Sequence, residues 1–195
     1  MARTKPPDQR REDLLDAAEA AFLAHGVAGT TVEDITTGAG VAKGTFYLHF
    51  RSRADVVRAV QVRYGERFVR RLEAAIAGAG DDWGAKLDGV VDAGFEDHRT
   101  SGALHDVIFV QPGAATEGLE HEVDDLVGVL RDLLDAGVAA GAFDVADTRA
   151  TAMVLFNAVH GIYNPVWAGI GPVDEPALAA AARTVLRRAA GLRTP

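Results

Sequence analysis

The sequence predicts an all-α protein, and three observations indicate this class. Apolar residues recur every three or four positions, most clearly at Val56, Val60 and Tyr64, which is the period of one face of a helix. No run of alternating β-branched residues in the sequence is long enough to predict a strand. Threonine or serine stands three residues before an acidic residue at several expected helix starts, as in N-terminal capping boxes.

The first part of the chain is expected to hold four helices. The first carries an apolar face that includes Leu14, Leu15 and Phe22, and Gly26 is a natural stop after it. Glycines also end the short second helix, whose start is capped by a threonine. The four helices are expected at about residues 8–25, from Thr30 or Thr31 to Gly38 or Gly40, from Ala42 or Lys43 to Phe50, and from Ser52 to Gly78.

The stretch AGAGDDWG, residues 77–84, marks a boundary between two regions of the chain. Beyond it, prolines and glycines separate further segments with helical periodicity. These helices are expected at Trp83–His98, Ala103–Phe109, Gly118–Ala140, Thr148–Trp167 and Pro176–Ala190.

Composition excludes several kinds of site. The 195 residues include no cysteine, which rules out disulfides, thiolate metal sites and thiol catalysis. The N-terminal residues are basic and have no apolar core, so they do not resemble a secretory signal and a cytoplasmic protein is expected. Residues 150–173 carry no charge, but polar residues and Pro165 interrupt them, so no membrane association is expected.

The net charge of −8 is unevenly distributed along the chain. Residues 1–71 hold 12 Lys and Arg against 9 Asp and Glu, whereas residues 72–195 hold 8 against 19. A basic first third is compatible with binding to nucleic acid, because the field near the phosphates decides that interaction.

The stretch GVAKGTFYLHF, residues 40–50, is the most distinctive in the sequence, and two chemical interpretations of it fail. The glycines at 38, 40 and 44 miss the spacing of dinucleotide-binding loops and follow no strand. No catalytic serine elbow or zinc-helix motif occurs, and His49 has no carboxylate close in sequence. We therefore expect no catalytic residue, no cofactor and no metal site.

A helix over Lys43–Phe50 explains this stretch better. At about 100° per residue, Phe46 and Phe50 share a face that must point to a core, while Gly44 and Leu48 point nearly opposite. Glycine permits close approach of a duplex, threonine and tyrosine offer hydrogen bonds, and leucine suits a thymine methyl group. Residues 31–50 are therefore interpreted as a helix-turn-helix motif with Lys43–Phe50 as its recognition helix.

Residues 14–60 also resemble the DNA-binding domain of the tetracycline-repressor (TetR) family. The similarity extends from DAAEAAF and HG, through TVED and the following isoleucine, to GVAKGTFYLHF. The resemblance implies a homodimer on a palindromic double-stranded DNA operator, with repression relieved when a small molecule binds the C-terminal domain. It places the DNA-binding domain at residues 8–68 and the effector-binding and dimerisation domain at 69–195.

The same resemblance implies particular DNA contacts. Two departures from the family pattern weaken them: Ala42 replaces a serine that would hydrogen-bond a phosphate, and Thr36 and Gly38 should make the supporting helix less rigid. The implied phosphate contacts are Thr31, Lys43, Tyr47, His49 and Arg53, and the implied base-edge contacts are Gly44, Thr45 and Leu48.

The second region is expected to bind a largely apolar effector and to dimerise through its last two helices. Asn157, His160 and Asn164 share one helix face and are interpreted either as interface hydrogen-bonding groups or as polar groups in the pocket. A transcriptional activator of the same architecture, or an all-α small-molecule-binding protein or enzyme, remains an alternative. The residues nominated for the pocket are Phe95, Leu104, Phe109, Leu126, Leu130, Phe156, His160 and Trp167.

Overall fold

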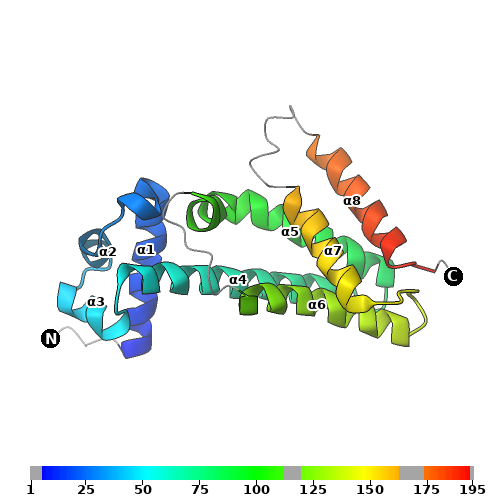
Figure 1. Ribbon diagram of the computed structural model, residues 1–195, viewed down its shortest axis with the longest axis horizontal. Coiled ribbons are helices and arrows are strands. Elements are labelled where there is room, and N and C mark those ends of the chain that lie inside the picture. The colour runs from blue at the N-terminus through cyan, green and yellow to red at the C-terminus, as the bar shows by residue number, and fades with distance from the viewer. Residues whose placement is uncertain (1–5, 112–119, 163–173, 194–195) are drawn as a thin grey trace. The chain divides into compact units, whose positions relative to one another are not determined.

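The computed structural model describes residues 6–111, 120–162 and 174–193, and every regular element in these ranges is a helix (Figure 1). The predicted all-α class is therefore confirmed. The elements are α1 (Pro7–Gly29), α2 (Val32–Gly38), α3 (Lys43–His49), α4 (Arg53–Gly78), α5 (Trp83–His105), the π-helix η1 (Asp106–Val110), α6 (Glu120–Ala139), α7 (Thr148–Gly161) and α8 (Glu175–Ala189).

Most helices keep close to their expected bounds, but α5 does not. The sequence predicts a break after His98, whereas α5 continues to His105 and passes directly into η1. That prediction is wrong because residues 99–110 include no proline, so every residue there can donate its backbone N–H to the continuing helix. The expected end of α7 at Trp167 lies outside the described residues.

The first compact unit combines residues 1–64 with residues 101–119. Its apolar core includes the fully buried side chains of Phe22 and Phe46, and α1 contacts both α2 and η1. Gly26, with φ of 72°, interrupts the regular helix of α1 as its sequence position predicts. The Thr30 hydroxyl then donates to the carbonyl of Gly26 at 2.8 Å, so Thr30 closes this turn and does not cap α2.

The second compact unit combines residues 65–100 with residues 120–195. Here α6 packs on α7 and α7 on α8, around a core that includes Leu134 and Leu186. Gly137 must lack a side chain because a Cβ atom there would overlap the Phe143 ring.

The predicted functional division between residues 68 and 69 stays a prediction, because the two compact units are defined by packing and not by function. No helix in the described ranges is long and apolar enough to span a membrane.

Arg63 of α4 joins three carboxylates of α1 in the first unit. Its guanidinium donates to Glu12 at 3.1 Å, to Asp16 at 2.8 Å and, through Nε, to Glu19 at 3.1 Å. Burial by itself lowers the pKa of Arg63, but the hydrogen bonds to Glu19, Glu12 and Asp16 outweigh burial, so the pKa lies above its ordinary value. Only 13% of the Arg63 side chain is exposed, so water screens its charge weakly. The network therefore holds α1 against α4 through charge-assisted hydrogen bonds.

We expect the substitution Arg63→Gln to lower the free energy of unfolding by about 1.5–3 kcal/mol, the range for hydrogen bonds to charged groups. Chemical denaturation followed by circular dichroism measures this change. The matched control is Arg131→Gln in α6, whose exposed guanidinium pairs with Asp132 at 2.7 Å and should contribute under about 1 kcal/mol. Equal losses in the two variants would contradict the structural importance of the Arg63 network.

Candidate nucleic-acid interface

The helix-turn-helix begins with a capping box at the start of α2. The backbone N–H of Asp34 donates to the Thr31 hydroxyl at 3.2 Å, and the backbone N–H of Thr31 donates to the Asp34 carboxylate at 2.8 Å. The hydroxyl of Thr31 donates to the same carboxylate at 2.7 Å. Hydrogen bonds from the Thr31 backbone and side chain lower the pKa of Asp34. A phosphate contact by the Thr31 hydroxyl stays a prediction, and it would compete with Asp34.

The recognition helix α3 has two chemically different faces. Phe46 is fully buried and its ring centroid lies 5.5 Å from that of Phe50, which is also buried. On the other side, 52% of Tyr47 and 82% of Leu48 are exposed. The predicted division of α3 into a core face and an outward face is therefore confirmed by burial. An exposed leucine of this degree has no role in the core of the protein.

Gly44 leaves open space on the outward face of α3. A Cβ atom at this position would have no atom within 4 Å. Lys43 beside it is exposed, while Thr45 and His49 are half-buried. The glycine is therefore not required by packing within the described chain, which favours an external partner as the reason for it. Ala42, the N-terminal cap residue, makes no side-chain capping bond.

Thr36 and Gly38 in α2 have packing roles that the sequence did not predict. The buried Thr36 hydroxyl donates to the carbonyl of Glu33 at 3.1 Å. A Cβ atom at Gly38 would lie 3.3 Å from the Cβ atom of Ala17 in α1. The glycine thus lets α2 approach α1 closely, and the lower rigidity expected of α2 stays a prediction.

Arg53 has a structural role that the sequence did not predict. Its Nη1 atom donates to the carbonyl oxygens of Val27 and Thr30, the latter at 3.2 Å. These carbonyls follow the interruption at Gly26, so the first turn of α4 holds the end of α1 in place. A phosphate contact by Arg53 stays a prediction and would have to use the other guanidinium nitrogens.

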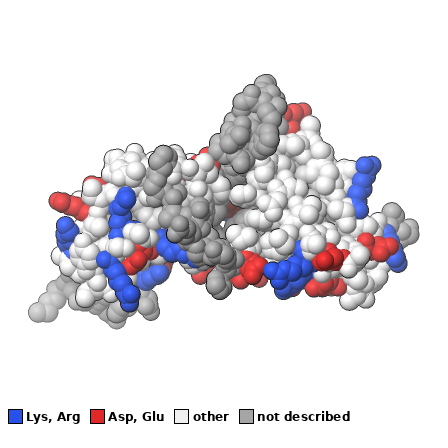
Figure 2. All heavy atoms as spheres, viewed as in Figure 1, with Lys and Arg blue, Asp and Glu red and all other residues white. Residues whose placement is uncertain are grey.

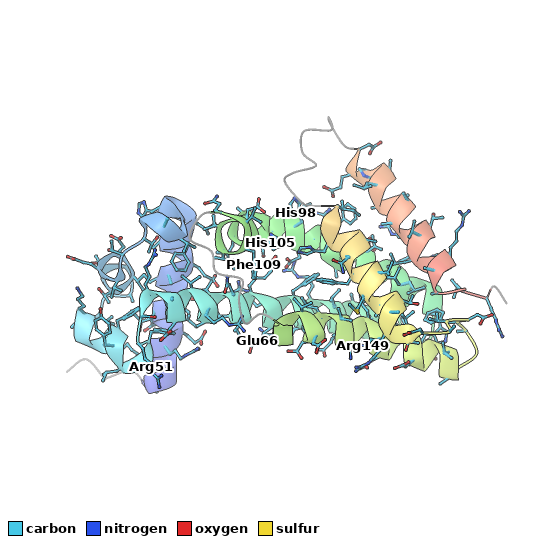
Figure 3. All side chains as sticks on the ribbon, in the orientation of Figure 1. Arg51, Glu66, His98, His105, Phe109 and Arg149 are labelled. Carbon is cyan, nitrogen blue, oxygen red and sulfur yellow. The ribbon has the colours of Figure 1, made fainter. Side chains whose placement is uncertain are left out.

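The residues nominated for an effector pocket are divided between the two units. Leu104 and Phe109 belong to the apolar cluster of the first unit, where Phe109 lies 5.1 Å from His105 between ring centroids (Figure 3). His160 is exposed and stacks on Phe156, and Trp167 lies outside the described residues. The apolar core of the second unit contains Phe95, Leu126, Leu130 and Phe156.

A second exposed surface lies on α7 and α8, which each have one apolar face buried and another exposed. The exposed stripe of α7 includes Met153, Val154 and Asn157, whose side-chain amide donates to the Met153 carbonyl at 2.8 Å. Asn157 is thus placed on the stripe, whereas Asn164 lies outside the described residues. We use the name α7–α8 stripe for the following exposed residues of the two helices: Ala150, Met153, Val154, Asn157, Ala158, Ala177, Ala181, Thr184 and Val185.

Metal-binding groups are not found in the described ranges, where no three His, Asp or Glu residues are placed to hold an ion. The arrangement of α2, α3 and their cap instead defines a DNA-binding regulator of the helix-turn-helix class.

Comparison with known proteins identifies the family. Residues 14–60 match the family model for bacterial regulatory proteins of the tetR family, and residues 85–186 match the tetracyclin repressor-like C-terminal domain. Since the second match alone spans more than half of the chain, the chain belongs to the TetR family.

Individual relatives agree with this assignment. The regulator TtgR of Pseudomonas putida is 46% identical over 61 residues, which are 31% of this chain but only 29% of TtgR. The repressor KstR2 of Mycolicibacterium smegmatis is 29% identical over 147 residues, covering 70% of this chain and 69% of KstR2. The crystal structure of FadR from Bacillus subtilis with stearoyl-CoA has a TM-score of 0.72 at 21% identity, covering 93% of this chain and 99% of that one.

Proposed function

We propose that this protein is a ligand-responsive transcriptional repressor that binds a palindromic operator as a homodimer in the cytoplasm. The observation that carries the proposal is the outward face of α3, where Gly44 is unobstructed and Leu48 is almost fully exposed. A face of small, apolar and hydroxyl-bearing side chains is poorly suited to water but well suited to base edges in the major groove. Lys43, Tyr47 and His49 lie on the same short helix and are proposed as phosphate contacts.

The proposed effector is a small, largely apolar molecule. Two observations support this proposal: the nominated residues in the core of the second unit, Phe95, Leu126, Leu130 and Phe156, are apolar, and the chain shares its fold with a regulator whose structure contains stearoyl-CoA. Effector binding would shift the protein to a conformation with lower operator affinity. A thermal-shift screen with apolar compounds, followed by operator release in the presence of each hit, tests this part of the proposal.

The primary experiment is binding of the protein to duplexes covering its own upstream DNA, measured by fluorescence anisotropy. Saturable binding that weakens with salt is the expected result. A reporter gene placed behind the bound sequence then separates repression from activation. Absence of saturable binding to this DNA and to neighbouring promoters would contradict the proposed function.

We expect Leu48→Ala to weaken operator binding about five- to tenfold while changing the free energy of unfolding by less than about 0.5 kcal/mol, because the side chain is exposed. Replacing each operator thymine in turn by uracil, which lacks the C5-methyl group, locates the contact. At one position the wild-type protein should lose affinity and the Leu48→Ala protein should not. If every thymine position affects both proteins equally, Leu48 does not contact a thymine methyl group.

A further inference from the structure

Three arginines beside the end of the recognition helix take no part in the DNA contacts proposed for α3 and its neighbours. Arg10 and Arg11 lie in the first turns of α1, and Arg51 follows the C-terminal cap of α3. The sequence adds two more positive charges, Arg3 and Lys5, just before α1. We call Arg10, Arg11 and Arg51 the flanking basic surface.

One contact brings the start of α1 to the end of α3. The guanidinium carbon of Arg11 lies 5.4 Å from the centroid of the Phe50 ring, and Phe50 is the C-terminal cap residue of α3. Arg51 is the next residue in the chain, and Figure 3 labels it beside the first turns of α1. The flanking basic surface therefore lies at the C-terminal end of α3.

Arg11 and Arg51 are exposed and Arg10 is half-buried, and two carboxylates near them bind other groups as well. At about 100° per residue, Arg10 lies roughly 160° around α1 from Glu12, which faces Arg63 of α4 at 3.1 Å. The Asp55 carboxylate accepts hydrogen bonds from the backbone N–H of Arg51 and from the Ser52 hydroxyl. Arg11 has a weak pair with Glu12 at 3.6 Å, and 45% of its side chain is exposed.

Positive charge on this unit faces solvent although the whole protein carries a net charge of −8. Figure 2 shows several Lys and Arg side chains on the part of the surface formed by α1, α2 and α3. A polyanion that already contacts α3 would therefore meet further cations at the end of that helix. Guanidinium groups on a flexible stem are well suited to phosphate oxygens and need no particular base sequence.

We propose that the flanking basic surface binds the DNA backbone outside the base pairs contacted by α3, and so extends the operator beyond its base-specific core. This inference rests on the proposed function. It adds a sequence-independent contribution to affinity, so it should appear in the salt dependence and in the length of DNA required, but not in base preference.

The experiment compares wild-type protein with a variant in which Arg10, Arg11 and Arg51 are all replaced by glutamine. Two duplexes are used, both carrying the sequence that the wild-type protein selects from a random library. The short duplex ends at the outermost selected base pair, and the long duplex adds about six arbitrary base pairs on each side, roughly half a helical turn. Operator affinity is measured by fluorescence anisotropy at several KCl concentrations, and thermal unfolding confirms that each variant is folded.

On the long duplex the triple variant should bind at least about tenfold more weakly, and its slope of log affinity against log salt should fall by about 1 for each phosphate that the protein no longer binds. On the short duplex the two proteins should bind alike, and the discrimination between selected and altered sequences should be unchanged. Arg11→Lys should restore most of the slope that is removed by Arg11→Gln, because it restores the charge. Arg51→Gln alone, at an exposed position, provides a variant with little risk to folding.

The control Arg131→Gln in α6 removes an exposed arginine of the second unit and should leave the slope unchanged. An unchanged slope in the triple variant, or an equal reduction of affinity on both duplexes, would overturn the flanking contact while leaving the proposed function intact. If the wild-type protein selects no DNA sequence, the proposed function and this inference both fail.

Discussion

The substitution Gly44→Ala is expected to make the protein slightly more stable and yet to lower its operator affinity about 10- to 100-fold. Stability should rise by up to about 1 kcal/mol because alanine favours a helix over glycine, and the new Cβ atom meets nothing within 4 Å. Affinity should fall because the same methyl group holds the helix axis away from the base edges, and weakened base recognition costs about 1–3 kcal/mol. Thermal unfolding and fluorescence anisotropy measure the two effects separately.

Gly128→Ala provides the matched control for this prediction. Gly128 also lies within a helix, α6, and a Cβ atom there also has no neighbour within 4 Å. This variant should gain stability in the same way without any change in operator affinity. Unchanged operator binding in Gly44→Ala would contradict close approach of α3 to DNA. A loss of stability in that variant would show that Gly44 is needed by the fold itself.

The recognition helix, including the outward position of Gly44, could be predicted from the sequence because its geometry is local. A seven-residue helix with Phe46 at its core face allows one arrangement of its other side chains, which angular spacing alone gives. The capping box at Thr31 is equally local, since its partner Asp34 is three residues away. The side-chain faces of α3 and the capping box of α2 were therefore predicted correctly, whereas the break expected after His98 was not.

Features that depend on distant parts of the chain were not predicted. Arg63 pairs with carboxylates more than 40 positions away, and Arg53 donates to carbonyl groups 23 and 26 positions away. Periodicity gives the face on which such a residue lies but not the helix that covers it. The grouping of residues 101–119 with residues 1–64 is likewise a tertiary property. The positive charges of Arg53 and Arg63 are evident from the sequence. The sequence alone could not distinguish an arginine inside an ion-pair network from one that faces DNA.

The largest loss of operator binding is expected from breaking the α7–α8 stripe, which we propose as the dimer interface. Val154 is 67% exposed and Val185 is 51% exposed, and each lies among small residues that permit close helix packing. A symmetric interface presents the same stripe from both subunits, so one substitution introduces two changes. The double substitution of Val154 and Val185 by aspartate places four buried carboxylates in such an interface, where unpaired charge is strongly unfavourable.

Sedimentation velocity should show the double variant as a monomer at concentrations where the wild-type protein is a dimer. Operator affinity should fall about 100- to 10,000-fold, because each half-site must then be bound without the second one tethered nearby. Val138→Asp, at a 39% exposed position in α6 outside the stripe, should remain dimeric and bind normally. A single half-site duplex extends the comparison, since wild-type and monomeric proteins should bind it with similar affinity per subunit.

Thermal unfolding distinguishes a broken interface from a damaged fold. Both valines are exposed in the isolated chain, so the monomer should stay helical, and its melting temperature should no longer depend on protein concentration. A dimeric double variant would place the interface elsewhere. A monomer that still binds the full operator as tightly as the wild-type protein would mean that the two half-sites are not coupled through α7 and α8.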